Sequence, residues 1–152
     1  MFNIKKMQIG DIEKTISIVK KLFINSDIDE LKKEFMQYLE KNDTVIYVCY
    51  LENEIIAFAQ CQLRYDYVEG TNSSPVGYLE GIYVDSMYRK QGIATKLLEK
   101  CEKWSHEKGC TEFASDCELN NRVSFNFHLR AGFEEANRII CFRKKIDRKS
   151  VV

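Results

Sequence analysis

The chain has 152 residues, of which 45% are hydrophobic and 30% charged, a composition that predicts one folded globular domain over residues 1–152. Lysine plus arginine and aspartate plus glutamate both number 23, and this balance argues against nucleic acid as a partner. The N-terminus shows no signal-peptide pattern and no apolar run has the ~20 residues of a membrane span. We therefore expect a cytoplasmic protein with no membrane partner.

The first half of the chain predicts a strand, two amphipathic helices and a β-hairpin. Alternation predicts a strand over residues 2–7, and helical spacing of apolar residues predicts helices from Asp11 onward and over residues 27–40. Residues 44–66 contain two β-rich runs separated by a polar turn at residues 52–54, which is typical of a hairpin. A loop that contains the single proline follows over residues 68–75.

The second half predicts alternating strands and helices. The expected order is a strand over residues 76–84, a helix that ends at Gly109, a strand over 111–116, a helix that ends at Gly132, and a strand over 138–146. This order indicates an α+β domain with a mostly antiparallel sheet, in which residues 76–116 form a parallel crossover.

The sequence positions of the cysteines and histidines are typical of a protein with reduced thiols and without a metal site. None of the six cysteines forms a C-x-x-C pair, and most lie in apolar runs, so we expect reduced core thiols. The chain has only two histidines, and neither has a cysteine at ligand spacing. We therefore predict no metal site.

The segment "RKQGIA" opens the helix that follows the strand over residues 76–84. Gly92 allows a ligand to approach the backbone, and the N–H groups and dipole of a first helical turn attract phosphate. The pattern is also that of an ordinary solvated helix start.

Glu80 is a carboxylate inside an apolar strand. Period-two alternation places Tyr78, Glu80, Ile82 and Val84 on one face, and Gly81 suggests a bulge or a ligand lying on the strand. Because a buried unpaired carboxylate is costly, Glu80 must pair, face a cavity or bind a cation, and its purely structural alternative is a core ion pair or a hydrogen-bonded glutamate.

Taken with this context, "RKQGIA" and "NNRVSFNFHLRAGFEE" resemble the two signature regions of the GCN5-related N-acetyltransferase (GNAT) superfamily. The resemblance implies an acyl-CoA N-acyltransferase fold, in which helices flank a central, mixed but mostly antiparallel sheet. It also implies direct attack of an amine on acetyl-CoA in a ternary complex. The backbone of Ile82, Tyr83 and Val84 would pair with the pantetheine arm, and Asn121 would contact the arm near the thiol. The pyrophosphate would lie on Arg89, Lys90, Gln91, Gly92, Ile93, Ala94 and Thr95.

The segments "RYDYVEGTNSSPVGYLEGIYV", "EFASDCELNN" and "GFEEANRIICFRK" are similar to those of aminoglycoside 6′-N-acetyltransferases, which confer antibiotic resistance. This resemblance implies that Asp116 is the base, and its alternative is a turn or helix-capping aspartate. Glu80 would hold a ring amine, Phe23 and Tyr67 would face the sugar rings, and Asn137 would contact substrate.

His128 stands where many relatives place a tyrosine that protonates the leaving thiolate, so it is either an acid or a packed histidine. Relatives are commonly homodimers, so we expect a homodimer. Two other functions stay open at this point: an acetyltransferase for a polyamine, metabolite amine or protein N-terminus, and a non-catalytic acyl-CoA sensor.

Overall fold

The computed structural model describes residues 1–22 and 25–147. Its elements follow the predicted order as far as residue 130. They are β1 (Phe2–Lys6), α1 (Ile12–Leu22), α2 (Ile28–Glu40), β2 (Thr44–Leu51), β3 (Glu54–Arg64), β4 (Val76–Val84), α3 (Ile93–Glu107), β5 (Phe113–Ser115) and α4 (Arg122–Arg130), with short 3-10 turns at Ile9–Asp11 and Ser86–Tyr88.

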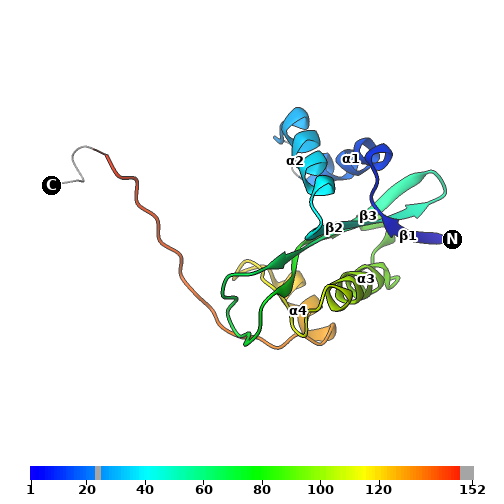
Figure 1. The fold of residues 1–152 in the computed structure, drawn as a ribbon. Coiled ribbons are helices and arrows are strands. Elements are labelled where there is room, and N and C mark those ends of the chain that lie inside the picture. Colours follow the sequence, from blue (N-terminus) through cyan, green and yellow to red (C-terminus); the bar gives the residue numbers. More distant parts are fainter. Residues whose placement is uncertain (23–24, 148–152) are drawn as a thin grey trace.

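The five strands form one sheet in the order β1-β2-β3-β4-β5 (Figure 1). Neighbours among the first four strands are antiparallel, whereas β4 and β5 are parallel and joined by the crossover through α3. This arrangement is the mixed, mostly antiparallel sheet that the sequence predicts.

Helices cover both faces of the sheet, α1 and α2 on one and α3 and α4 on the other (Figure 1). Ile16 and Phe35 of α1 and α2 pack with Val48 of β2 in one apolar cluster. Leu97 and Trp104 of α3 belong to a second cluster on the opposite face. Within residues 1–22 and 25–147, no helix combines the length and apolarity that a membrane crossing requires.

The cysteines follow the prediction only in part. All six are free thiols, and four of them are buried, namely Cys49, Cys61, Cys101 and Cys110. Cys117 is half-buried and Cys141 is exposed, the latter because its segment lies outside the core.

The predicted strand over residues 138–146 is wrong for the single chain. Instead, the segment extends away from the sheet and its helices (Figure 1), with Ile140 and Phe142 81% and 89% exposed. The alternation of apolar residues is typical of a strand, but a strand forms only where a neighbour supplies hydrogen bonds. Within its own chain this segment pairs with none of the described strands.

Candidate active site

Strand β4 contains a bulge at Glu80. Gln60 pairs with Gly81 and Cys61 with Leu79, so Glu80 has no Cα partner of its own on β3. The extra residue reverses the side-chain alternation, as Gly81 had suggested. Ile82 and Val84 therefore pack under α3 with Leu79, and the prediction that they share a face with Tyr78 is wrong.

β4 and β5 part at the bulge. Their last pair is Leu79 with Ser115, and β4 continues to Val84 with β3 as its described neighbour. Since Asp85 donates to the Ile56 carbonyl (2.8 Å), ladder alternation turns the backbone groups of Ile82 and Val84 toward the open side. The same alternation turns those of Tyr83 toward β3, so its predicted backbone role is less accessible than those of its neighbours.

The first turn of α3 follows this open edge. Gly92 adopts the left-handed conformation (φ 79°), no side chain caps the helix, and a Cβ at this position would meet nothing within 4 Å. The first-turn N–H groups of Ile93, Ala94 and Thr95 thus lack a side-chain cap, and the space beside Gly92 is open, as binding an anion requires.

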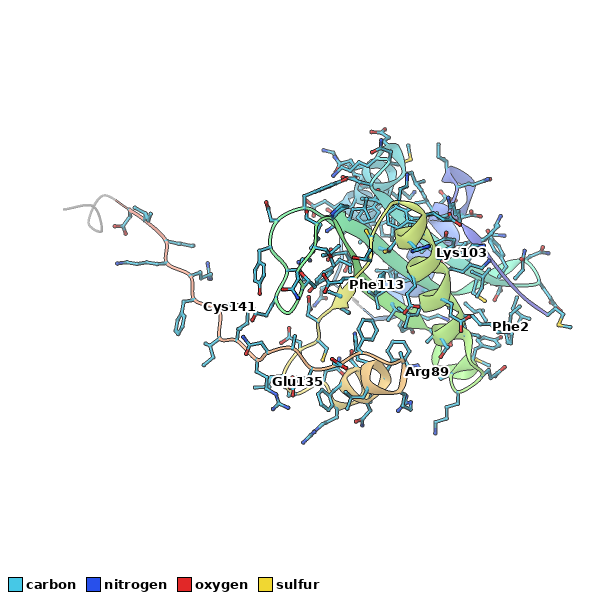
Figure 2. All side chains as sticks on the ribbon, turned by 60° about the horizontal axis from the view of Figure 1, so that its bottom comes forward. Phe2, Arg89, Lys103, Phe113, Glu135 and Cys141 are labelled. Carbon is cyan, nitrogen blue, oxygen red and sulfur yellow. The ribbon has the colours of Figure 1, made fainter. Side chains whose placement is uncertain are left out.

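Two basic residues precede Gly92 in different conformations. Arg89 donates from Nε to the Val84 carbonyl (3.0 Å), which ties the turn to the end of β4. Lys90 has a φ of 64°, and Gln91 lies with it on the exposed turn. Figure 2 shows Arg89 where α3 and α4 approach each other.

Asp116 follows β5 directly and accepts a hydrogen bond from the hydroxyl of Tyr78 on β4. Burial, and after it the bond to Asp116, raises the pKa of Tyr78, so the hydroxyl remains a donor. The carboxylate belongs to an exposed residue and is free to meet a ligand with its other oxygen.

Glu80 forms an ion pair rather than lying free. Arg64 donates to both of its oxygens, from Nη2 to Oε1 at 2.8 Å and from Nε to Oε2 at 2.9 Å, and Gln62 also donates to Oε2. The hydrogen bond to Glu80 raises the pKa of Arg64 above its usual value. The site therefore contains the structural ion pair that the sequence left open for Glu80.

His128 has hydrogen-bond partners on both ring nitrogens. Nδ1 lies 2.7 Å from the Ser124 carbonyl, which can only accept, so Nδ1 carries a proton. Nε2 lies 2.8 Å from the Ser115 hydroxyl, and in the neutral ring it accepts the hydroxyl proton at a shorter distance than the Leu79 carbonyl, which lies 3.4 Å from the same hydroxyl. The ring also packs against Phe127 and Phe133.

The remaining predicted site residues lie at the start of α4, in the loop after β3 and in the segment after α4, and one lies outside the described residues. Asn121 caps α4 by accepting from the Ser124 N–H (3.1 Å), and Tyr67 is 76% exposed in the loop after β3. Asn137 donates to Glu69 of the same loop (3.0 Å). Phe23 lies outside the described residues.

Sequence reasoning missed Arg64, Gln62, Tyr78 and Ser115 as site residues. A signal for the first two was present, because Gln60, Gln62 and Arg64 alternate with apolar residues and mark a polar face of β3. Their meeting with Glu80 depends on the bulge, which the alternation alone does not reveal.

Comparison with known proteins gives consistent relatives. Residues 12–133 match the family model described as the acetyltransferase (GNAT) family. An aminoglycoside N(6′)-acetyltransferase type 1 of Acinetobacter haemolyticus is 37% identical over 145 residues, which span 95% of this chain and 99% of that protein. One of Acinetobacter genomosp. 13 is 43% identical over 79% of this chain and 84% of its own length.

Solved structures agree with this result. AAC(6′)-Iy in complex with the bisubstrate analogue CoA-S-monomethyl-acetylneamine superposes with a TM-score of 0.91 at 32% identity, over 96% of this chain and 99% of that one. AAC(6′)-Ih from Acinetobacter baumannii gives 0.90 at 34% identity, over 97% and 100%.

Proposed function

The chain belongs to the acetyltransferase (GNAT) family, and from this premise we propose that it transfers the acetyl group of acetyl-CoA to the 6′-amino group of aminoglycosides, conferring resistance to them. Relatives that span almost the whole chain carry this activity in their names, and one similar structure binds an analogue that joins CoA to an aminoglycoside. The same family could acetylate other amines, and the test below separates them.

The parting of β4 and β5 is the observation that carries the proposal. On the C-terminal side of the bulge lie the open edge of β4 and the uncapped start of α3. The carboxylates of Glu80 and Asp116 lie at the bulge and at the end of β5. A site with an anion-binding end and an acidic end fits an anionic donor and a polycationic acceptor. This separation also explains how a chain without net charge can bind both.

The donor end fits acetyl-CoA. The first turn of α3 offers N–H groups for the pyrophosphate, and the exposed residues Arg89, Lys90 and Gln91 precede it in the chain. The outward backbone of Ile82 and Val84 would bind the pantetheine arm as an added strand, although the Val84 carbonyl also accepts from Arg89. Asn121 retains its amide NH₂ for the arm near the thiol, since its cap uses Oδ1.

Asp116 is the proposed base at the acceptor end. Acetyl-CoA supplies a thioester-activated acetyl group, which the acceptor amine takes directly as the carbon–sulfur bond breaks. An amine is mostly ammonium at neutral pH, and Asp116 accepts the proton that it must lose, directly or through water. The hydroxyl of Tyr78 holds one oxygen of the carboxylate during this transfer.

Other side chains provide charge and surface for the acceptor. Glu80 adds negative charge, but the ion pair with Arg64 neutralises it, so Asp116 makes the main contact with the ammonium group. Tyr67 would face a sugar ring, and Asn137, held by Glu69, would contact a ring substituent.

His128 acts as an acid only when both ring nitrogens carry protons. In the neutral ring, Nε2 accepts from Ser115, and the residue orients that hydroxyl instead. We propose that this orienting role is the main one, and that the departing thiolate does not depend on His128 for its proton.

We also propose that the chain forms a homodimer in the cytoplasm. Asn137 donates to Glu69 near the start of the C-terminal segment, which extends away from the rest of the chain at Cys141 (Figure 2). Beyond Asn137 the segment exposes Ile139, Ile140, Phe142 and Ile146. Such a segment would be buried by pairing with the short β5 edge of a second copy, and the reverse exchange would make the contact symmetric.

Light scattering should give twice the chain mass, and Phe142→Asp should give the single-chain mass. The free thiols fit a reducing compartment.

The function is tested by following thiol release from acetyl-CoA with paired acceptors. We expect turnover with a kanamycin-type aminoglycoside and none with the matched compound that has a 6′-hydroxyl. Equal turnover on both would remove the 6′ assignment, and turnover on polyamines alone would change the acceptor class. CoA binding without turnover on any amine would indicate a sensor.

A further inference from the structure

Arg64 contacts one site carboxylate, Glu80, and the hydrogen-bond partner of the other, Asp116. Its guanidinium forms two hydrogen bonds with Glu80, and its Cζ lies 3.4 Å from the centre of the Tyr78 ring. Tyr78 in turn donates its hydroxyl to Asp116. One planar cation at the end of β3 therefore joins a salt bridge, an aromatic ring and, through that ring, the proposed base.

We infer that Arg64 is a positioning residue for acetyl transfer: it holds the Tyr78 ring so that the hydroxyl orients Asp116, and it neutralises Glu80 so that Asp116 is the main contact of the reacting ammonium. The inference rests on the proposed function, because the reaction it supports is the one proposed above. No contact between Arg64 and either substrate is required.

The geometry needs arginine rather than any cation. A guanidinium is flat, so it can stack on a ring with its face while its edge donates two parallel bonds to a carboxylate. The side chains of Arg64 and Glu80 are 39% and 21% exposed, so solvent screens this pair less than it would a surface pair. A lysine could pair with Glu80, but it could not stack on the Tyr78 ring and at the same time donate two parallel hydrogen bonds to the carboxylate.

The net charge of the acceptor end follows from the same contacts. Glu80, Asp116 and Arg64 together carry one net negative charge, and the Arg64 guanidinium interacts electrostatically with both carboxylates. The cluster is thus matched to a single ammonium. With Glu80 bound at both oxygens, that ammonium is directed to Asp116 instead of being shared between two carboxylates.

The test compares Arg64→Met and Arg64→Lys with wild type, in thiol release with a kanamycin-type acceptor. We expect kcat to fall by about 10- to 100-fold in Arg64→Met, since misplaced reacting groups cost up to about 10²-fold. The KM for acetyl-CoA should change less than about twofold, because Arg64 lies away from the donor end, and Arg64→Lys should recover only a small part of kcat. Arg130→Met makes the same chemical change on an exposed side chain of α4 and should leave kcat unchanged.

A double-mutant cycle separates positioning from general stability. In a Tyr78→Phe background the hydroxyl is absent, so Arg64→Met should lower kcat by a clearly smaller factor than in wild type. The unfolding free energies of the same four proteins give an independent measure of coupling between the two side chains. If Arg64→Met does not fold, Arg64→Lys takes its place in the cycle.

Different failures point to different errors. If the wild-type protein acetylates the acceptor and the folded Arg64→Met variant keeps its kcat within twofold of wild type, the inference is overturned and the proposed function stays intact. An equal fold decrease in kcat from Arg64→Met in wild type and in Tyr78→Phe would also overturn the inference. A wild-type protein that acetylates no aminoglycoside would refute the proposed function, and the coupling in unfolding free energy would then decide whether Arg64 positions Tyr78.

Discussion

Replacing Gly92 with alanine tests the donor end of the site. The residue has a φ of 79°, and the added methyl would meet nothing within 4 Å, so the cost of the change is confined to the backbone. A non-glycine residue in the left-handed region costs about 1–2 kcal/mol. For a chain of this size, 1 kcal/mol lowers Tm by about 2–4 °C, so a decrease of about 2–8 °C is expected.

The same change should weaken acetyl-CoA binding. Relief of this strain turns the alanine backbone out of the left-handed region, and the first-turn N–H groups of α3 then no longer point together at the pyrophosphate. An anion at a helix start is stabilised by up to about 2 kcal/mol, so we expect an increase in Kd of about 5- to 30-fold. Calorimetric titration with CoA measures this directly.

Gly109→Ala is the matched control. Gly109 follows the other end of α3 with a φ of 94°, and its methyl would also meet nothing within 4 Å. It should lower Tm by a similar amount and leave the Kd of CoA unchanged. An unchanged Kd in Gly92→Ala as well would refute the assignment of the first turn of α3 as the pyrophosphate site.

Three further changes test other parts of the molecule. Gly77→Ala makes the new methyl overlap the buried Ser105 Oγ and should lower the free energy of unfolding in urea by about 1–3 kcal/mol; an unchanged midpoint would contradict the packing. His128→Gln should lower kcat less than about tenfold, whereas a loss above about 10²-fold would identify an acid. Burial raises the pKa of Tyr47 and Tyr50 to about 12, and the folded state thus keeps phenolic protons that the unfolded state loses near pH 10. The free energy of unfolding should therefore hold below about pH 10 and fall toward pH 12; a constant value would contradict this.

Local patterns in the sequence predict most of the fold. Alternation and helical spacing identify nine of the elements because each depends on a face that packs within the chain. Residues 138–146 have an equally good strand pattern, yet they are extended and exposed. Their pairing partner is not defined by local sequence, and pattern alone cannot tell an internal neighbour from a second copy.

The site was predicted less completely than the fold. The helix start at Gly92 and the position of Asp116 after β5 follow from local signals, and the structure shows both. The Arg64–Glu80 ion pair and the Tyr78–Asp116 hydrogen bond depend on register across three strands, and the bulge at Glu80 changes that register by one residue. A shift of one residue exchanges faces, so alternation without the bulge assigned Ile82 to the wrong face.

The most direct test of the central claim is the structure of the acetylated product made by the wild-type protein and by Asp116→Asn. NMR of the product from a kanamycin-type acceptor should show a single acetyl group on the 6′ nitrogen. Asp116→Asn should form the same product at least about 10²-fold more slowly, with nearly unchanged affinity for acetyl-CoA. Acetylation at another nitrogen, or an unchanged rate in Asp116→Asn at saturating substrates, would contradict the account.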